Sequence, residues 1–175
     1  AAGGRFEYNN AGYALLGIII ERATGEPCSE VIRKRLLEPL GLKETGYAAL
    51  DADVPHLLPG LGPNGAIDER IYDYSMIMSA GGMYATARDL AAWARAVTTN
   101  SLFPEWFRNA PVGWRRGERF GRPAQWHSGN TNTAAGLLVI FLDGDGRYVV
   151  LSNQGRVGMH ASIRPLAQML FDRDE

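Results

Sequence analysis

The first pattern in the chain is a helical one. Apolar side chains recur at spacings of three and four residues after Asn10; they are Tyr13, Leu16, Ile20 and Ala23, widened by Leu15 and Ile19. Asparagine is a favoured N-cap, and a glycine, here Gly25, commonly follows the last helical residue. The pattern predicts a helix capped by Asn10 and ended at Gly25.

A second helix is predicted to start at Pro27, because proline suits a first helical turn. The spacing directs Val31, Ile32 and Leu36 inward and leaves Glu30, Arg33, Lys34 and Arg35 in water. Pro39 together with Gly41 is expected to end this helix. The following segment, 43–74, is rich in proline and glycine, so we expect no long regular element there.

The third predicted helix begins after Thr86. Asp89 follows Thr86 at the spacing of a capping box, and Leu90, Trp93 and Val97 share one helical face that ends near Asn100.

In the last third of the chain the apolar residues no longer follow helical spacing. Residues 137–142 and 147–152 are rich in β-branched and apolar side chains and are joined by the turn sequence Asp-Gly-Asp-Gly, which predicts an antiparallel pair. Residues 113–127 are expected to add one more strand. A closing stripe predicts a C-terminal helix over the sheet; its members are Ile163, Leu166, Ala167, Leu170 and Phe171.

Helices followed by strands indicate an α+β fold rather than alternating βαβ units. We expect a mainly helical region over residues 1–110 and a region of antiparallel strands with a C-terminal helix over residues 111–175. Two or three strands form a thin sheet, which suggests that strands from a missing N-terminal segment complete it.

Composition and charge argue against several classes of function. The 175 residues carry 18 basic and 19 acidic side chains, a formal net charge of -1 that gives no reason to expect nucleic-acid binding. The chain has no apolar run near the ~20 residues that a membrane span requires. Its single cysteine, Cys28, and its scattered histidines, His56, His127 and His160, predict neither a metal site nor a cofactor. The sequence leaves the cellular compartment undetermined.

Tyr8-Asn9-Asn10 is the first candidate site. In a structural interpretation Asn10 caps the helix and Tyr8 packs in front of it. In a functional interpretation the positive end of the helix stabilises a Tyr8 phenolate for proton transfer, and the Asn10 amide contacts a substrate carbonyl.

Two further constellations have the same two interpretations. Trp126-His127-Ser128-Gly129 is either a half-buried packing segment or a polar strand edge that a ligand backbone approaches. Ser79-Ala80-Gly81-Gly82-Met83-Tyr84 is expected to serve mainly as a turn before the third helix.

These motifs in order resemble the β-lactamase-related serine hydrolases, which include class C β-lactamases, DD-peptidases, D-aminopeptidases and esterases. The resemblance rests on Phe6 to Gly17, Pro39-Leu40-Gly41-Leu42, Gly81-Gly82-Met83 and His127-Ser128-Gly129. It implies a β-lactamase/transpeptidase-like fold, present here in part.

The resemblance also implies roles. Tyr8 matches the family's Y-x-N tyrosine, which moves the proton of the nucleophile, and Asn10 matches its substrate-contacting partner. His127 begins an H-x-G motif in place of the Lys-Thr-Gly of β-lactamases, which favours an esterase or peptidase. Ser128 and Gly129 complete that motif, and the Asn130 N–H would be an oxyanion donor.

The family's nucleophile is the serine of a Ser-x-x-Lys motif, which these 175 residues do not contain. The expected function is therefore the C-terminal portion of a serine hydrolase that cleaves an ester, amide or peptide-like substrate through an acyl-enzyme. We expect the missing N-terminal segment to be a binding partner of this chain, and we expect this chain alone to be inactive. The alternative is a non-catalytic, penicillin-binding-protein-like relative that binds ligands.

Overall fold

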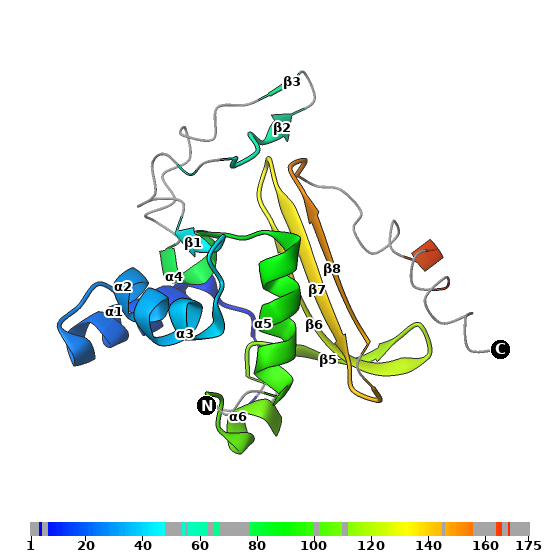
Figure 1. The fold of residues 1–175 in the computed structure, drawn as a ribbon, viewed down its shortest axis with the longest axis horizontal. Helices are drawn as coiled ribbons and strands as arrows, with labels where there is room; N and C mark the ends of the chain where they lie inside the picture. The colour runs from blue at the N-terminus through cyan, green and yellow to red at the C-terminus, as the bar shows by residue number, and fades with distance from the viewer. Residues whose placement is uncertain are drawn as a thin grey trace. The chain divides into compact units, whose positions relative to one another are not determined.

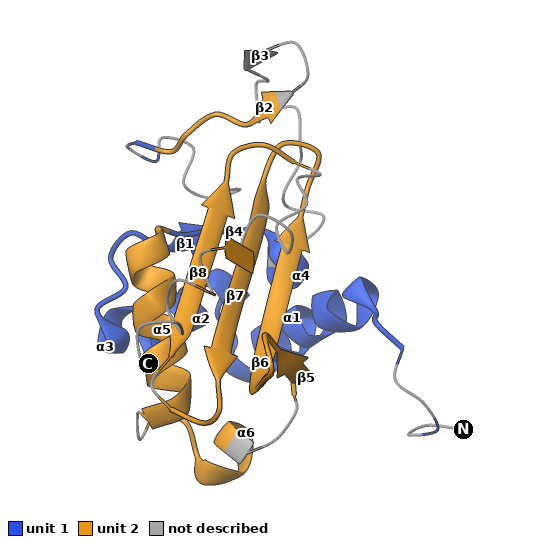
Figure 2. Cartoon of the chain, turned by 90° about the vertical axis from the view of Figure 1, so that its right-hand side faces the viewer, with its two compact units in different colours: residues 1–56, 72–85 blue, residues 57–71, 86–175 orange. Residues whose placement is uncertain are grey.

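The computed structural model divides the chain into two units that interleave along the sequence (Figure 2). Unit 1 comprises residues 1–56 and 72–85, and unit 2 comprises residues 57–71 and 86–175. The structure describes residues 4, 7–47, 54, 56–62, 65–66, 78–99, 102–109, 112–144, 146–155, 164–165 and 168. The predicted division into a mainly helical region, 1–110, and a region of strands, 111–175, stays a prediction. The two units have other boundaries, because helix α5 (Ala87–Thr99) belongs to the same unit as the sheet.

Helix α1 (Asn10–Thr24) opens unit 1, but Asn9 caps it rather than Asn10. The backbone of Asn9 is extended, and its side-chain oxygen accepts the Gly12 N–H at 3.1 Å. The predicted cap was therefore wrong by one residue. The predicted end is confirmed, because Gly25 adopts the left-handed conformation at φ 72° and donates its N–H to the Glu21 carbonyl.

The second predicted helix is three short pieces, α2 (Cys28–Ile32), the π-helix η1 (Arg33–Leu37) and α3 (Glu38–Leu40). Pro39 does not end the helix as predicted but lies within α3, and Gly41 ends it at φ 69°. Proline lacks an N–H and crowds the preceding turn, which the wider π-helical turn accommodates: the Glu38 N–H donates to the carbonyl of Arg33, five residues earlier. Leu37 is consequently the buried leucine, whereas Leu36 is only partly buried.

The rest of unit 1 is short. Helix α4 (Met78–Gly81) precedes strand β4 (Met83–Tyr84), which pairs antiparallel with β1 (Gly46–Tyr47). In unit 2, β2 (Leu61–Gly62) and β3 (Gly65–Ala66) form an equally short antiparallel pair. The described part of 43–74 thus holds no long element, as its composition predicted.

Unit 2 contains a four-stranded antiparallel sheet in the order β5-β6-β7-β8, and α5 runs along it (Figure 1). The strands are β5 (Arg115–Arg119), β6 (Arg122–Asn130), β7 (Ala135–Phe141) and β8 (Arg147–Ser152). The predicted β7–β8 pair is confirmed. The sheet gains two strands where the sequence predicted one, because Phe120 and Gly121 both adopt positive φ and form a two-residue hairpin turn between β5 and β6.

Strand β7 is buried on both of its faces. One face carries a core of Ala124, Ala135, Leu137, Val139 and Phe141. The other face packs Leu138 and Ile140 against Ala94 of α5, with Trp93, Trp114 and Val149 around them. Burial on both faces explains why β7 is apolar throughout.

Helices α5 and α6 of unit 2 differ in whether the sequence predicted them. The capping of α5 is confirmed, because the Thr86 hydroxyl accepts the Asp89 N–H at 3.2 Å. A short helix that was not predicted, α6 (Glu105–Asn109), follows it and stacks Phe107 on Phe103. The stripe of the predicted C-terminal helix lies outside the described residues.

Candidate functional site

Tyr8 and Asn10 stand at the N-terminus of α1. Both residues are exposed, and Tyr8 immediately precedes the cap residue. Since Asn9 holds the first turn, capping does not occupy the side chain of Asn10. The structure therefore removes the capping interpretation of Asn10 and leaves a phenol and a primary amide together at the positive end of a 15-residue helix.

The His127-Ser128-Gly129-Asn130 segment forms the last four residues of β6. His127 is paired with Leu138 of β7, so it lies on the α5-facing side of the sheet, whereas Ser128 shares the opposite side with Leu137. His127 is half-buried, and Ser128, Gly129 and Asn130 are exposed. Polar groups are thus presented on both sides of one strand end.

The pairing of β5 stops where this segment starts. The β5–β6 ladder ends at Arg115↔Trp126, while β7 continues to pair with β6 as far as Asn130. Trp114, the residue before β5, packs into the Ala94–Leu138–Ile140 core and leaves the ladder. Among the described strands, none pairs with residues 127–130 on the side opposite β7, so this strand end is a sheet edge.

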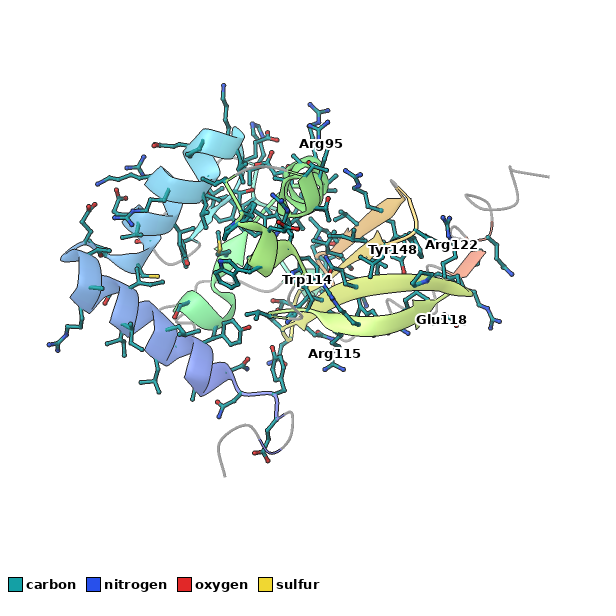
Figure 3. All side chains as sticks on the ribbon, turned by 90° about the horizontal axis from the view of Figure 1, so that it is seen from below. Arg95, Trp114, Arg115, Glu118, Arg122 and Tyr148 are labelled. Atoms are coloured by element: carbon teal, nitrogen blue, oxygen red, sulfur yellow. The ribbon has the colours of Figure 1, made fainter. Side chains whose placement is uncertain are left out.

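The charge of Arg115 reaches this edge. Arg115 is exposed and lies on β5, on the opposite side of the sheet from the α5 residue Arg95 (Figure 3). Burial lowers the pKa of His127 from its ordinary value, and the positive charge of Arg115 lowers this pKa further. His127 is therefore mainly a neutral imidazole near pH 7, able to donate and accept hydrogen bonds.

A turn that the sequence analysis missed holds the end of β6. The Thr131 hydroxyl accepts the Ala134 N–H at 2.9 Å, and the Thr131 N–H donates to the Ala134 carbonyl at 2.8 Å. Gly155 packs against the same turn so closely that a Cβ would lie 2.3 Å from the Asn132 carbonyl oxygen. The threonine three residues before Ala134 was the available signal, since threonine side chains close such turns.

Ser79 has a packing role. Its hydroxyl donates to the Ala14 carbonyl of α1 at 3.4 Å, and its side chain fills the space beside Gly17. This agrees with the structural interpretation of the Ser79–Tyr84 segment.

A cavity of about 470 Å³ in unit 1 contains none of the predicted site residues. Leu37, Leu42 and Tyr47 contribute apolar surface to its lining, and Arg33 also lines it. The Arg33 guanidinium forms ion pairs with Glu30 and Glu38, which neutralise its charge. Tyr47 is buried and forms a hydrogen bond with the buried Cys28.

The described part of the chain shows neither a candidate metal site nor a candidate membrane-spanning helix. There, no cluster of three or more histidine, cysteine, aspartate or glutamate side chains could hold a metal ion. The helices of that same part lack the combination of length and apolarity that crossing a bilayer requires.

The predicted site residues fall in two groups. Tyr8 and Asn10 belong to unit 1, and His127, Ser128, Gly129 and Asn130 belong to unit 2. Within each group the structure brings the residues together, at one helix end and at one strand edge. That the two groups act together stays a prediction.

Comparisons with known proteins agree with this fold. A family model described as Beta-lactamase matches residues 1–170. The chain is 23% identical over 103 residues to the D-alanyl-D-alanine-carboxypeptidase/endopeptidase AmpH of Escherichia coli K12, a stretch that is 59% of this chain and 26% of AmpH. The chain thus spans only about a quarter of that relative.

Solved structures cover the chain more fully. The D-amino acid amidase from Ochrobactrum anthropi SV3, complexed with L-phenylalanine, matches with a TM-score of 0.83 and 21% identity over 98% of this chain and 58% of the amidase. A penicillin binding protein from Bacillus halodurans matches with a TM-score of 0.79 and 24% identity over 97% of this chain and 57% of that protein. The predicted α+β, β-lactamase/transpeptidase-like fold is confirmed.

Proposed function

Because the chain belongs to the Beta-lactamase family, we propose that it is the substrate-binding and proton-transfer part of a serine hydrolase acting on an ester, amide or peptide-like substrate. The observation that carries the proposal is the sheet edge at residues 127–130, which begins where the β5 ladder ends. An extended substrate binds such an edge by adding backbone hydrogen bonds to it.

The residues of the edge divide the binding between them. Gly129 has no side chain, so a substrate backbone can approach the strand closely there. The Asn130 N–H is the proposed donor to the oxyanion, and Ser128 offers a hydroxyl beside it. His127, kept mainly neutral by burial and by Arg115, would orient the substrate without attracting a carboxylate as strongly as a lysine would.

Tyr8 is the proposed proton shuttle. In acyl transfer a serine oxygen attacks the substrate carbonyl as its proton leaves, and that proton is then given to the departing alcohol or amine. A phenol at a helix N-terminus suits this work, since the local positive potential stabilises its anion. Asn10, with its amide not used for capping, is placed on the same helix end to bind the substrate carbonyl.

The serine itself is proposed to lie outside these 175 residues, since they contain no Ser-x-x-Lys. Acyl transfer through a serine needs no cofactor, and none is proposed.

Two preparations test the proposal, the 175-residue chain and the protein translated from the start of its own reading frame. Both would be treated with a p-nitrophenyl ester and with a fluorescent penicillin, then examined by mass spectrometry. We expect a burst of nitrophenol and a covalent adduct on a serine for the longer protein only. An adduct on the 175-residue chain would contradict the prediction that the nucleophile lies outside it. The absence of an adduct on the longer protein would contradict the proposal that the protein is a serine hydrolase.

The absence of Ser-x-x-Lys from the chain also favours a second candidate, a penicillin-binding-protein-like relative that binds ligands without cleaving them. Reversible binding of a peptide-like ligand by the longer protein, without turnover or adduct, would identify it. A reading frame whose upstream part encodes Ser-x-x-Lys would argue for the hydrolase.

A further inference from the structure

The cavity of unit 1 has an apolar wall built by a tight helix end. Its lining comes from α2, η1, α3, β1 and β4, and Figure 1 shows α2, α3 and β1 close together. Gly41, in the left-handed conformation, reverses the chain after α3, and the Leu42 N–H donates to the Leu37 carbonyl at 2.9 Å. This is the pattern of a Schellman motif, in which the residues at these two positions pack together. Both leucines are buried and line the cavity.

Two polar side chains of the lining are not engaged. The others already have an interaction; they are Glu30, Arg33, Glu38, Thr45, Tyr47 and Tyr84. Within the part of the chain that the structure describes, neither the Ser29 Oγ nor the Lys43 Nζ has a hydrogen-bond or ion-pair partner.

Ser29 is the more informative of the two, because it is only 7% exposed. Hydroxyl groups at this depth ordinarily have a hydrogen-bond partner, and a buried one without a partner costs free energy. Since Ser29 lines the cavity, a molecule in the cavity can supply that partner.

The charges around the cavity favour an anion over a cation. Glu30 and Glu38 share the guanidinium of Arg33, whereas Lys43 has no counter-ion among the described residues. A cationic ligand would have to compete with Arg33 for a carboxylate. An anionic ligand gains an ion pair with Lys43 and breaks none.

We propose that this cavity is a binding site for a small carboxylic acid with a flat apolar body. The body lies on Leu37 and Leu42, the carboxylate pairs with Lys43, and a polar atom of the body forms a hydrogen bond with the Ser29 hydroxyl. The cavity volume of about 470 Å³ is in the range of pockets that hold small ligands, ~300–1,000 Å³. This inference does not depend on the proposed function, whose residues do not line the cavity.

Titration of the 175-residue chain with indolepropionate, followed by two-dimensional amide NMR, tests the site. This probe joins a carboxylate to an indole, whose N–H can donate to the Ser29 Oγ. We expect saturable binding that shifts the backbone amides of the cavity wall, at Gly41, Leu42 and Gly46. The proposal is overturned if millimolar probe does not saturate the chain, or if the saturable shifts lie only at residues outside the cavity.

Lys43→Gln tests the ion pair, with Lys34→Gln as the matched control. Lys34 is the other lysine of the chain; it pairs with Glu26 and does not line the cavity. Lys43→Gln should weaken indolepropionate binding at least ~5-fold, whereas uncharged indolepropionamide should bind this variant and the wild type alike. The control should change neither affinity. Equal binding of the acid to Lys43→Gln and to the wild type, or tighter binding of the cation tryptamine than of the acid, would overturn the assignment of an anion.

Ser29→Ala tests the buried hydroxyl. The substitution should weaken indolepropionate binding at least ~3-fold but leave the affinity for naphthylpropionate unchanged, because naphthalene has no N–H to donate. A distorted cavity would weaken both probes, so an equal loss for the two would overturn the place given to Ser29. Should Ser29→Ala not fold, the Lys43 comparisons decide the proposal.

Discussion

Gly17 and Ser79 approach each other so closely that no side chain larger than hydrogen fits at position 17. A Cβ built on Gly17 would lie 2.4 Å from the Ser79 Oγ and 2.7 Å from its Cβ. The contact joins α1 to α4, and α1 carries Tyr8 and Asn10 at its start. The packing of one glycine thus supports the helix end on which the proposed chemistry depends.

Replacing Gly17 by alanine should destabilise the chain by ~1–3 kcal/mol, because either α4 or α1 must move. Thermal unfolding of the 175-residue chain measures this effect. Gly12→Ala is the matched control on the same helix: a Cβ there meets nothing within 4 Å, so alanine should stabilise the helix by ~0.5–1 kcal/mol.

The double variant Gly17→Ala/Ser79→Gly removes both atoms that clash and should recover most of the loss. A Gly17→Ala protein as stable as the wild type would show that the contact is not a constraint on α1.

His127 should titrate below the ordinary histidine pKa of ~6.5. Burial is the main cause of the lowered pKa and the charge of Arg115 is the second, so Arg115→Gln should raise the pKa only in part. Two-dimensional NMR of the imidazole protons gives both values. A His127 pKa at or above the ordinary one, or no change in Arg115→Gln, would contradict this account of the sheet edge.

The same lowered pKa predicts the pH dependence of stability. The unfolded chain binds a proton at His127 at a higher pH than the folded chain does. The free energy of unfolding therefore decreases as the pH falls from ~6.5 toward the folded-state pKa. Above ~pH 6.5 the contribution of His127 is constant. Replacing His127 by asparagine should flatten this part of the stability curve measured by urea unfolding between pH 7 and pH 5.

Cys28 should be unreactive in the folded chain. Burial raises the pKa of its thiol, and the negative charge of Glu21 raises it further, although the hydrogen bond with Tyr47 acts in the opposite direction. Burial also raises the pKa of Tyr47 to about 12, so the hydroxyl stays protonated at working pH. Iodoacetamide at pH 8 should label the native thiol at least ~10-fold more slowly than the unfolded one.

Glu21→Gln separates charge from burial at Cys28. Glutamine keeps an oxygen that can accept the Cys28 N–H but removes the negative charge, so labelling should become faster while remaining slower than in urea. Native labelling as fast as in urea would show that Cys28 is not enclosed.

The elements that could be predicted are those with complete local signals. Gly25 ended α1 as expected, and Thr86 with Asp89 started α5 as expected, because capping is decided within four residues. The β5–β6 hairpin was missed because Phe120-Gly121 is an unusual pair for a turn with two positive φ values. The π-helical turn before Pro39 was missed because it depends on how the chain absorbs a proline.

The candidate site divides in the same way. Tyr8, Asn10 and the His127-Ser128-Gly129-Asn130 run could be selected from the sequence as motifs. The sheet edge could not, since it depends on Trp114 packing into a core made by α5 and β7 rather than continuing the β5 ladder. The effect of Arg115 on His127 depends on the same register and was equally inaccessible.

Tyr8→Phe in the proposed longer protein, which would carry the nucleophilic serine, is the most direct test of the proposed chemistry. Phenylalanine keeps the ring and removes the hydroxyl, so kcat on a short-chain p-nitrophenyl ester should fall by ~10²–10⁴ with a smaller effect on KM. Tyr13→Phe is the matched control, because Tyr13 is another exposed tyrosine of α1, 43% exposed against 53% for Tyr8, and has no proposed role. Unchanged turnover in Tyr8→Phe, or an equal loss in Tyr13→Phe, would contradict the role of Tyr8.

A double-mutant cycle with His127→Ala then asks whether the two groups of site residues serve one reaction. If Tyr8 and His127 act on the same bound substrate, the losses in kcat/KM should not multiply, and the double variant should retain at least ~10-fold more activity than the product of the single losses predicts. Independent groups would give multiplicative losses. The cycle is informative because Tyr8 and His127 lie in different units, so a coupling between them in kcat/KM would have to arise through the substrate or the assembled site rather than through a contact along one element.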